Sequence, residues 1–183
     1  MIQAHRSRLT LVALCLCAAA ATPAVAQSQA ASTTSANPLP DPDKQFVQAA
    51  SQSSSTEIDA AKLAMENTRN KDVRTFARRM MLDHTKLTVQ LKMAAPHDVA
   101  VPKDNSDTAV LDSLRPLHDQ AFDRAYVQKV GVEGHRSAVE VFRQEASQGQ
   151  VAALKAAAQK ALPTIEHHYR MAQDLANKPG LSQ

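Results

Sequence analysis

The chain has 183 residues, which is enough for one domain, and its 21 lysines and arginines face 18 aspartates and glutamates. This near balance argues against a nucleic-acid-binding surface, which needs a basic excess on one face. Both cysteines, Cys15 and Cys17, lie in the N-terminal leader described next. The rest of the chain has no thiol, so disulfides, cysteine-ligated metals and cysteine nucleophiles are excluded there.

The N-terminal 26 residues have the pattern of a secretory signal peptide. Two arginines are followed by an apolar run over residues 9–21. Pro23 breaks this run early, so an uncleaved membrane anchor is disfavoured. Small residues at positions 24–26 predict cleavage after Ala26. The expected product is exported, periplasmic or secreted, with no stable transmembrane anchor after processing.

The next segment predicts a tether and a helical hairpin. Residues 27–42 are rich in Ser, Thr, Ala, Gln and Pro without periodic apolar residues, and they predict a disordered tether. One helix is predicted over about residues 43–67 and another over about 71–95, where Pro96 ends it. Asn70 is the expected N-cap of the second helix. Because the turn is short, the two helices are expected to be antiparallel neighbours.

The second half of the chain predicts two more long helices. The connection over residues 96–107 is polar, and fully extended it reaches roughly 40 Å. Helix three is predicted over about 117–147 and helix four over about 150–177, with 178–183 as a C-terminal tail. No segment shows strand alternation. We therefore predict an all-α fold, a four-helix bundle over residues 43–177 with a long crossover between helices two and three.

Each predicted helix carries an ionisable residue on its apolar face. At steps of three or four residues, these faces include Glu57, His84, His135 and His168. A buried charge or imidazole costs several kcal/mol unless it is paired. We therefore expect these side chains to meet one another or water inside the bundle.

Counting residues outward from the predicted turns gives the height of each side chain along the bundle. Glu57 and His84 fall within about one turn of each other. His135 and His168 fall roughly 10 Å apart along the axis, so His135 is expected outside the centre. The predicted metal-binding set is Glu57, Asp83, His84 and His168. The polar residues expected around this set, without direct ligation, are Asp123, Tyr126 and His135.

The order of these motifs resembles one bacterial exported family. The residues that carry the resemblance are Phe46, Glu57-Ile58, Val73, Phe76-Ala77, Asp83-His84-Thr85, Phe122-Asp123, Tyr126, His135, Leu162-Pro163 and His168. This pattern, from about residue 44 to 175, is similar to the family called domain of unknown function 4142. The resemblance implies a ferritin-like fold, in which the connection between helices two and three crosses the bundle. It implies no reaction, because the family has no established activity.

Three interpretations of His84 and His168 stay open at this stage. They are a hydrogen-bonded core network that fixes helix register, a site for copper, zinc or iron, and general acid–base catalysis. A di-iron ferroxidase is disfavoured because the chain contains no Glu-x-x-His pair. It also contains no Gly-x-Ser-x-Gly, phosphate-loop or His-Glu-x-x-His motif, so a non-enzymatic protein is favoured.

The leading functional prediction is an exported binding or envelope stress-associated protein with a buried centre of Glu, Asp and His. The alternative is a metal-sequestering or redox protein that uses the same centre. The partner classes considered are an envelope protein and a second copy of this chain, and nucleic acid is not among them.

Overall fold

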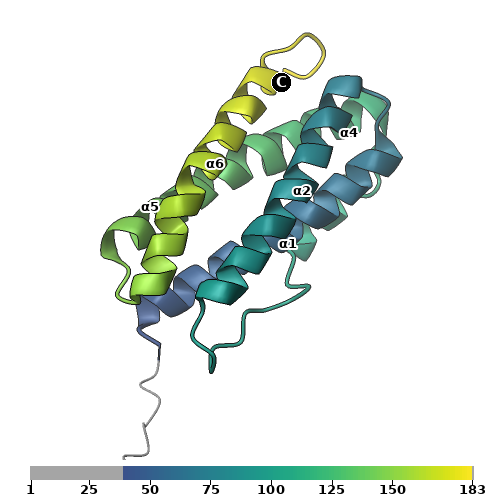
Figure 1. The fold of residues 1–183 in the computed structure, drawn as a ribbon. Helices are drawn as coiled ribbons and strands as arrows, with labels where there is room; N and C mark the ends of the chain where they lie inside the picture. Colours follow the sequence, from purple (N-terminus) through teal and green to yellow (C-terminus); the bar gives the residue numbers. More distant parts are fainter. Residues whose placement is uncertain (1–38, 183) are drawn as a thin grey trace, which may run out of the picture. The chain divides into compact units, whose positions relative to one another are not determined.

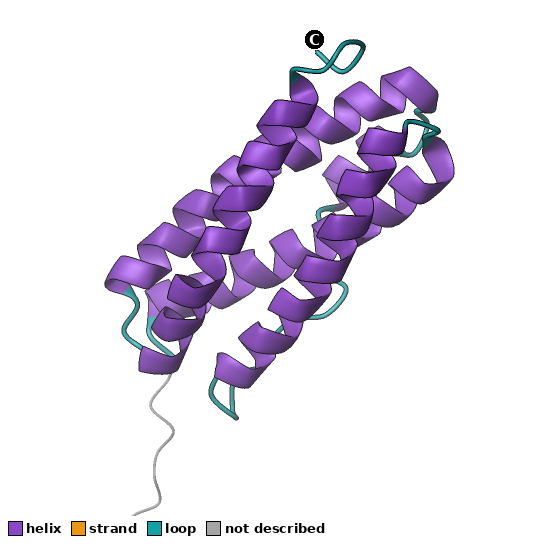
Figure 2. Cartoon of the chain, turned by 45° about the horizontal axis from the view of Figure 1, so that its top comes forward, coloured by secondary structure: helices purple, strands orange, loops and turns teal. Residues whose placement is uncertain are grey.

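The computed structural model describes residues 39–182, and these residues form helices and connecting loops without strands (Figure 2). The predicted signal peptide, and the predicted tether up to residue 38, lie outside the described residues. The prediction of an all-helical fold is confirmed for residues 39–182. Among the helices of this part, none is long and apolar enough to cross a membrane.

The first two helices form the predicted hairpin. α1 (Asp41–Asn67) and α2 (Lys71–Ala94) pack side by side along their length (Figure 1). Asn70 is the N-cap of α2, as predicted, and its side chain accepts hydrogen bonds from the backbone N–H groups of Asp72 at 2.9 Å and Val73 at 3.4 Å. α1 begins two residues earlier than predicted, inside the segment assigned to the tether.

The remaining helices complete a helical bundle. α4 (Asp119–Tyr126), a π-helical segment η1 (Val127–Gly134) and α5 (His135–Gln148) follow one another without a loop, and α6 (Ala152–Ala176) returns alongside α5. α5 also packs on α1, and α6 packs on α2. The bundle therefore encloses a common interior between these helices (Figure 1).

The connection between α2 and α4 follows the surface of α1. Its loop donates hydrogen bonds to α1 from the Asn105 amide to Ser51 Oγ at 2.9 Å and from the Asp107 N–H to Thr56 Oγ1 at 2.8 Å. The short helix α3 (Thr108–Leu114) then buries its leucines against the interior. These contacts hold the connection along α1, so that α4 starts near the turn between α1 and α2.

Two apolar clusters fill the bundle, one toward each end. The cluster near the α1–α2 turn includes Ala64, Phe76, Met80, Phe122, Val130 and Leu175. Leu181 joins it, so the segment predicted as a free C-terminal tail is packed against the core. The other cluster includes Phe46, Leu87, Val139, Phe142, Leu154 and Ile165. The polar residues predicted to be buried lie between the two clusters along each helix.

The π-helix shifts the buried face of the third long segment. The predicted stripe placed Ala121, Ala125 and Val132 inside, but Phe122 and Tyr126 are buried instead and Ala121 is exposed. A π-turn contains one residue more than an α-turn, so side chains before it rotate relative to those after it. A constant step of 3.6 residues therefore predicts the face correctly from His135 onward, but not before it.

The two glycines of this segment have different surroundings. A Cβ added to Gly131 would lie 3.0 Å from the Cβ of Ala172 on α6, so this glycine permits close approach of the two helices. A Cβ added to Gly134 would make only ordinary contacts, at 3.4 Å and beyond. Close packing therefore explains Gly131 and does not explain Gly134.

Gly131→Ala is expected to lower the free energy of unfolding by about 1–3 kcal/mol, because the added methyl overpacks the contact with Ala172. This cost outweighs the gain of about 1 kcal/mol in helix propensity. Gly134→Ala is the matched control and should leave stability unchanged or raise it by up to about 1 kcal/mol. Urea unfolding of both variants measures the difference, and equal effects at the two positions would contradict the packing argument.

Candidate functional site

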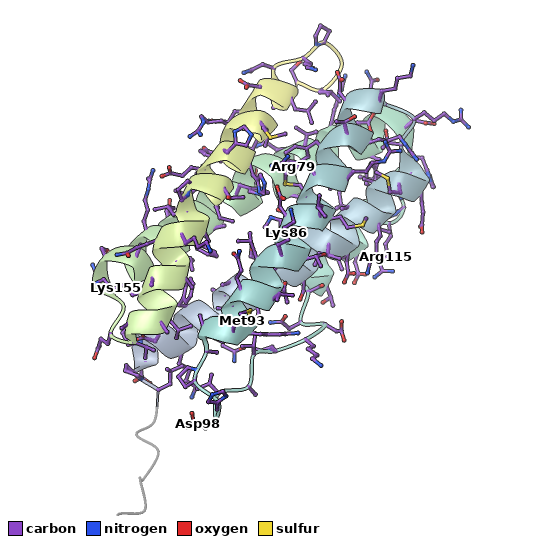
Figure 3. The ribbon with its side chains drawn as sticks, viewed as in Figure 1. Arg79, Lys86, Met93, Asp98, Arg115 and Lys155 are labelled. Carbon is purple, nitrogen blue, oxygen red and sulfur yellow. The ribbon has the colours of Figure 1, made fainter. Side chains whose placement is uncertain are left out.

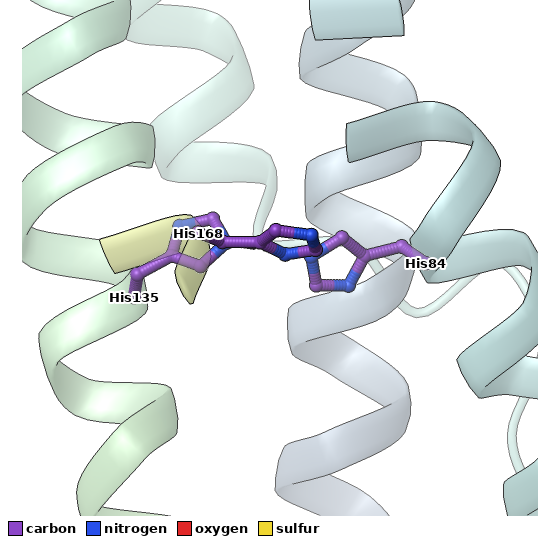
Figure 4. Close-up of side chains that lie close together, drawn as sticks. All are labelled: His84, His135 and His168. Atoms are coloured by element: carbon purple, nitrogen blue, oxygen red, sulfur yellow. Dashed lines mark hydrogen bonds between the residues drawn. The ribbon is translucent and has the colours of Figure 1, made fainter. Parts of the chain in front are cut away.

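Three buried histidines converge in the layer between the two apolar clusters. His84 comes from α2, His135 is the first residue of α5 after the π-helix, and His168 comes from α6 (Figure 4). Each side chain is at most 1% exposed. One ring nitrogen from each histidine lies within 4.8 Å of the corresponding nitrogen of the other two. The closest pair, Nε2 of His84 and Nε2 of His135, is 3.4 Å apart.

His135 is held by the end of the π-helix. Its backbone N–H bonds to the Val132 carbonyl, and its ring Nδ1 lies 3.0 Å from the carbonyl oxygen of Gly131 and 3.2 Å from that of Val130. A carbonyl can only accept, so Nδ1 carries the proton and donates. The other nitrogen, Nε2, is therefore left with a lone pair that points into the centre.

His168 is held by a carboxylate. Its Nε2 lies 3.0 Å from Oδ2 of Asp83 on α2, and its Nδ1 is buried without a hydrogen-bond partner among residues 39–182. Asp83 is also bonded to Arg79, and Lys86 lies on its other side (Figure 3). Burial acts to raise the pKa of Asp83, but the hydrogen bonds from His168 and Arg79 outweigh it and the pKa lies below its usual value. Asp83 is therefore a charged acceptor that orients His168 and leaves Nδ1 bare.

His84 has the weakest anchor of the three. Its Nδ1 lies 3.4 Å from the hydroxyl oxygen of Ser54 on α1, and its Nε2 faces His135. A hydroxyl can accept from Nδ1–H or donate to a bare Nδ1, so Ser54 permits either tautomer. Ser54 was not predicted as a site residue, although it lies three residues before Glu57 on the same helix, which places it on the same face.

Burial keeps all three imidazoles neutral. It lowers the pKa of His84 well below the usual value, and the neighbouring His135 and His168 lower it further. Burial, followed by the charge of His168, lowers the pKa of His135 to about 4. The pKa of His168 is also lowered by burial, against the opposing effect of Asp83. Neutral imidazoles present lone pairs, which is the form that binds metal ions.

Glu57 and Tyr126 lie behind His135. One carboxyl oxygen of Glu57 lies 3.2 Å from Nδ1 of His135. The other carboxyl oxygen and the Tyr126 hydroxyl are buried and without a hydrogen-bond partner in the described part of the chain. Burial raises the pKa of Glu57 well above its usual value, and burial together with the charge of Glu57 raises that of Tyr126. The centre thus contains several buried polar atoms that the protein itself does not satisfy.

The predicted position of His135 was wrong. Its ring centroid lies 5.4 Å from that of His168, in the middle of the centre and not roughly 10 Å away. The count placed the turn at a single point near Gln148, whereas α5 ends at Gln148 and α6 begins at Ala152. Measured from these ends, the two histidines differ by only three residues, about 4.5 Å of axial rise, which their side chains can span.

The other predicted residues fall into two groups. Glu57 and Asp83 lie one contact behind the ring nitrogens, against His135 and His168 respectively. Asp123 is buried elsewhere, beside Thr68 at the end of α1, where burial raises its pKa against a hydrogen bond from Thr68. The histidines at positions 97, 118 and 167 are exposed, as predicted.

Comparison with known proteins identifies a family and no closer relative. The family model described as domain of unknown function (DUF4142) matches residues 18–175. No curated protein and no solved structure matches the chain.

Proposed function

The chain belongs to the DUF4142 family, and we propose that it is a transition-metal-binding protein whose ligands are His84, His135 and His168. The observation that carries the proposal is the bare Nδ1 of His168, which is fully buried and faces the ring nitrogens of the other two histidines. A buried polar atom without a partner costs about 1–3 kcal/mol. A metal ion bound to all three nitrogens removes this cost.

The atoms behind the histidines support the same proposal. Histidine ligands in metal sites commonly donate their second N–H to a carboxylate or a backbone carbonyl, which fixes the tautomer. His168 has the carboxylate of Asp83 in this position, and His135 has two carbonyls and Glu57. Such an arrangement directs the remaining nitrogens to a common point.

A metal-free hydrogen-bond network is the competing arrangement. If Ser54 donates to Nδ1 of His84, then Nε2–H of His84 can donate to Nε2 of His135 across the 3.4 Å contact. This network satisfies the facing nitrogens of two histidines and leaves Nδ1 of His168 without a partner. A bound metal accounts for all three.

The donor set favours zinc or copper over iron. Three neutral imidazoles suit Zn²⁺ and copper, whereas a di-iron site needs carboxylates from several helices. A zinc ion held by three histidines would act as a Lewis acid toward a fourth ligand, and copper would add one-electron chemistry. Because the histidines are buried, we propose that the protein holds its metal and does not turn over a substrate at it.

The setting of this function follows from the sequence predictions. The leader over residues 1–26 supports export, so we propose that the metal is bound in the periplasm or outside the cell. The hairpins α1–α2 and α5–α6, joined by a connection along α1, support a ferritin-like arrangement. A role in envelope stress, an envelope partner and a homo-oligomer stay predictions.

The proposal is tested by calorimetric titration and elemental analysis of the processed protein, purified without a polyhistidine tag. We expect about one equivalent of Zn²⁺ or Cu²⁺. Replacing His84, His135 or His168 by Ala should each weaken binding at least about 100-fold, more than the loss of a supporting residue. His97→Ala and His118→Ala, at exposed histidines, are matched controls that should bind like the unaltered chain. Sub-stoichiometric binding by the unaltered chain would reject the metal site.

A further inference from the structure

We propose that a cavity between α1 and the η1–α5 segment is the path by which the metal ion enters, with Glu57 at its inner end. This inference rests on the proposed function, because it needs a metal that binds at the three histidines. Since these histidines are at most 1% exposed, an ion must reach them through the protein.

The cavity connects the surface to the interior. Its volume is about 280 Å³, and its rim includes the exposed residues Gln52, Lys129 and Ser137, whereas Glu57 and Ala138 on its inner wall are buried. Water occupies about 30 Å³ per molecule, so an ion with six waters needs about 180 Å³. The cavity can therefore admit a hydrated divalent ion.

Glu57 joins this cavity to the histidines. It lines the cavity and is 3% exposed, one of its carboxyl oxygens lies 3.2 Å from Nδ1 of His135, and the other has no hydrogen-bond partner within residues 39–182. A carboxyl oxygen is a ligand for divalent ions, and so are hydroxyl oxygens such as those of Ser53 and Ser137 on the way in. An ion can exchange waters for these oxygens before it reaches the imidazoles.

Gly134 supports the same path. It lines the cavity beside Glu57, and a Cβ at this position would lie 3.6 Å from Oε1 of Glu57 and 3.4 Å from the Lys129 carbonyl. Glycine is a poor helix former, yet alanine would fit here without a clash. Helix packing thus gives no reason for the missing side chain, whereas an open passage next to Glu57 does.

A second cavity near the centre is too small for entry. It borders Ser54, which contacts His84, but its volume is about 20 Å³, room for about one water molecule. A hydrated ion does not fit into it.

Stopped-flow mixing of the full processed chain with Zn²⁺ tests the path. Gly134→Val narrows the passage from within, and Ser137→Phe covers the rim from the surface. Each should slow association at least tenfold and leave the equilibrium dissociation constant unchanged, because a narrower passage slows entry and exit by the same factor. Arg136→Phe adds the same ring at an exposed position of α5 that does not line the cavity, and it should associate at the unaltered rate.

The outcomes separate the two proposals. If the unaltered chain binds no metal, the proposed function fails and the path falls with it. If it binds, and neither Gly134→Val nor Ser137→Phe slows association, the entry path is overturned while the histidine site stands. Ser137→Phe lies at the surface, so it remains informative if Gly134→Val does not fold.

Discussion

Zinc at a thousand times its dissociation constant is expected to raise the free energy of unfolding by about 4 kcal/mol. The three ligands come from α2, α5 and α6, so the site exists only when these helices are packed together. A metal that binds the folded chain alone shifts the unfolding equilibrium by mass action. Urea unfolding with zinc, and with a chelator in its place, measures the shift.

The His135→Ala variant distinguishes the metal site from the metal-free network. It removes the central ligand, so zinc should raise its stability by less than about 1 kcal/mol, whereas His118→Ala should keep the full shift. If the histidines only held the helices in register, the unaltered chain and His135→Ala would differ by the same amount with zinc and with chelator. That result would favour the network.

The second large effect is expected at the other end of the bundle, where two carboxyl groups meet. Asp43 of α1 is fully buried and accepts hydrogen bonds from the backbone N–H groups of Gln150, at 3.1 and 3.2 Å, and Val151, at 2.7 Å, just before α6. Glu145 of α5 is 2% exposed and lies so close to Gly149 that a Cβ there would overlap its carboxyl group. Burial, followed by the charge of Asp43, raises the pKa of Glu145 to about 7 against the opposing charge of Lys155.

The Glu145→Gln variant should be more stable than the unaltered chain by about 1–3 kcal/mol at pH 8 and nearly equal to it at pH 4.5. The folded chain holds the Glu145 proton up to about pH 7, whereas the unfolded chain releases it near pH 4.5. The stability that this group contributes is therefore complete below pH 4.5 and is lost as the pH rises through 7. The neutral amide of glutamine carries no such loss.

Urea unfolding between pH 4.5 and 8 measures this dependence, with Glu140→Gln, at an exposed glutamate of the same helix, as the control. The difference in stability between Glu145→Gln and the unaltered chain should grow with pH, and the control should show no such growth. Parallel curves for all three proteins would rule out a raised pKa for Glu145.

Local features were predictable wherever one helix decides them. The cap at Asn70 follows from its side chain and its own backbone neighbours. The buried faces of α2 and α6 follow from periodicity, and this placed His84 and His168 inside the bundle. The family was also recognised from the order of such residues, and its model matches residues 18–175.

The predicted position of His135 failed because it depends on more than one helix. The π-helix before it changes which side chains face inward, and the glycine at 131 that signals it acts through close contact with Ala172 on another helix. Its height relative to His168 depends on a turn three residues long, which the count treated as a point. Ser54 was missed for a related reason, because its importance comes from His84 across the interface.

The sequence by itself determined the helices, their caps and most of their buried faces, because propensity and periodicity act over a few residues of one chain segment. Only the tertiary structure decided which nitrogens converge and which carboxylates stand behind them. Distances between side chains on different helices sum every turn length, rise and rotation along the path between them, so an error of a few residues moves a ligand by several ångströms. The three-histidine centre is therefore a property of the packed bundle and not of any one of its helices.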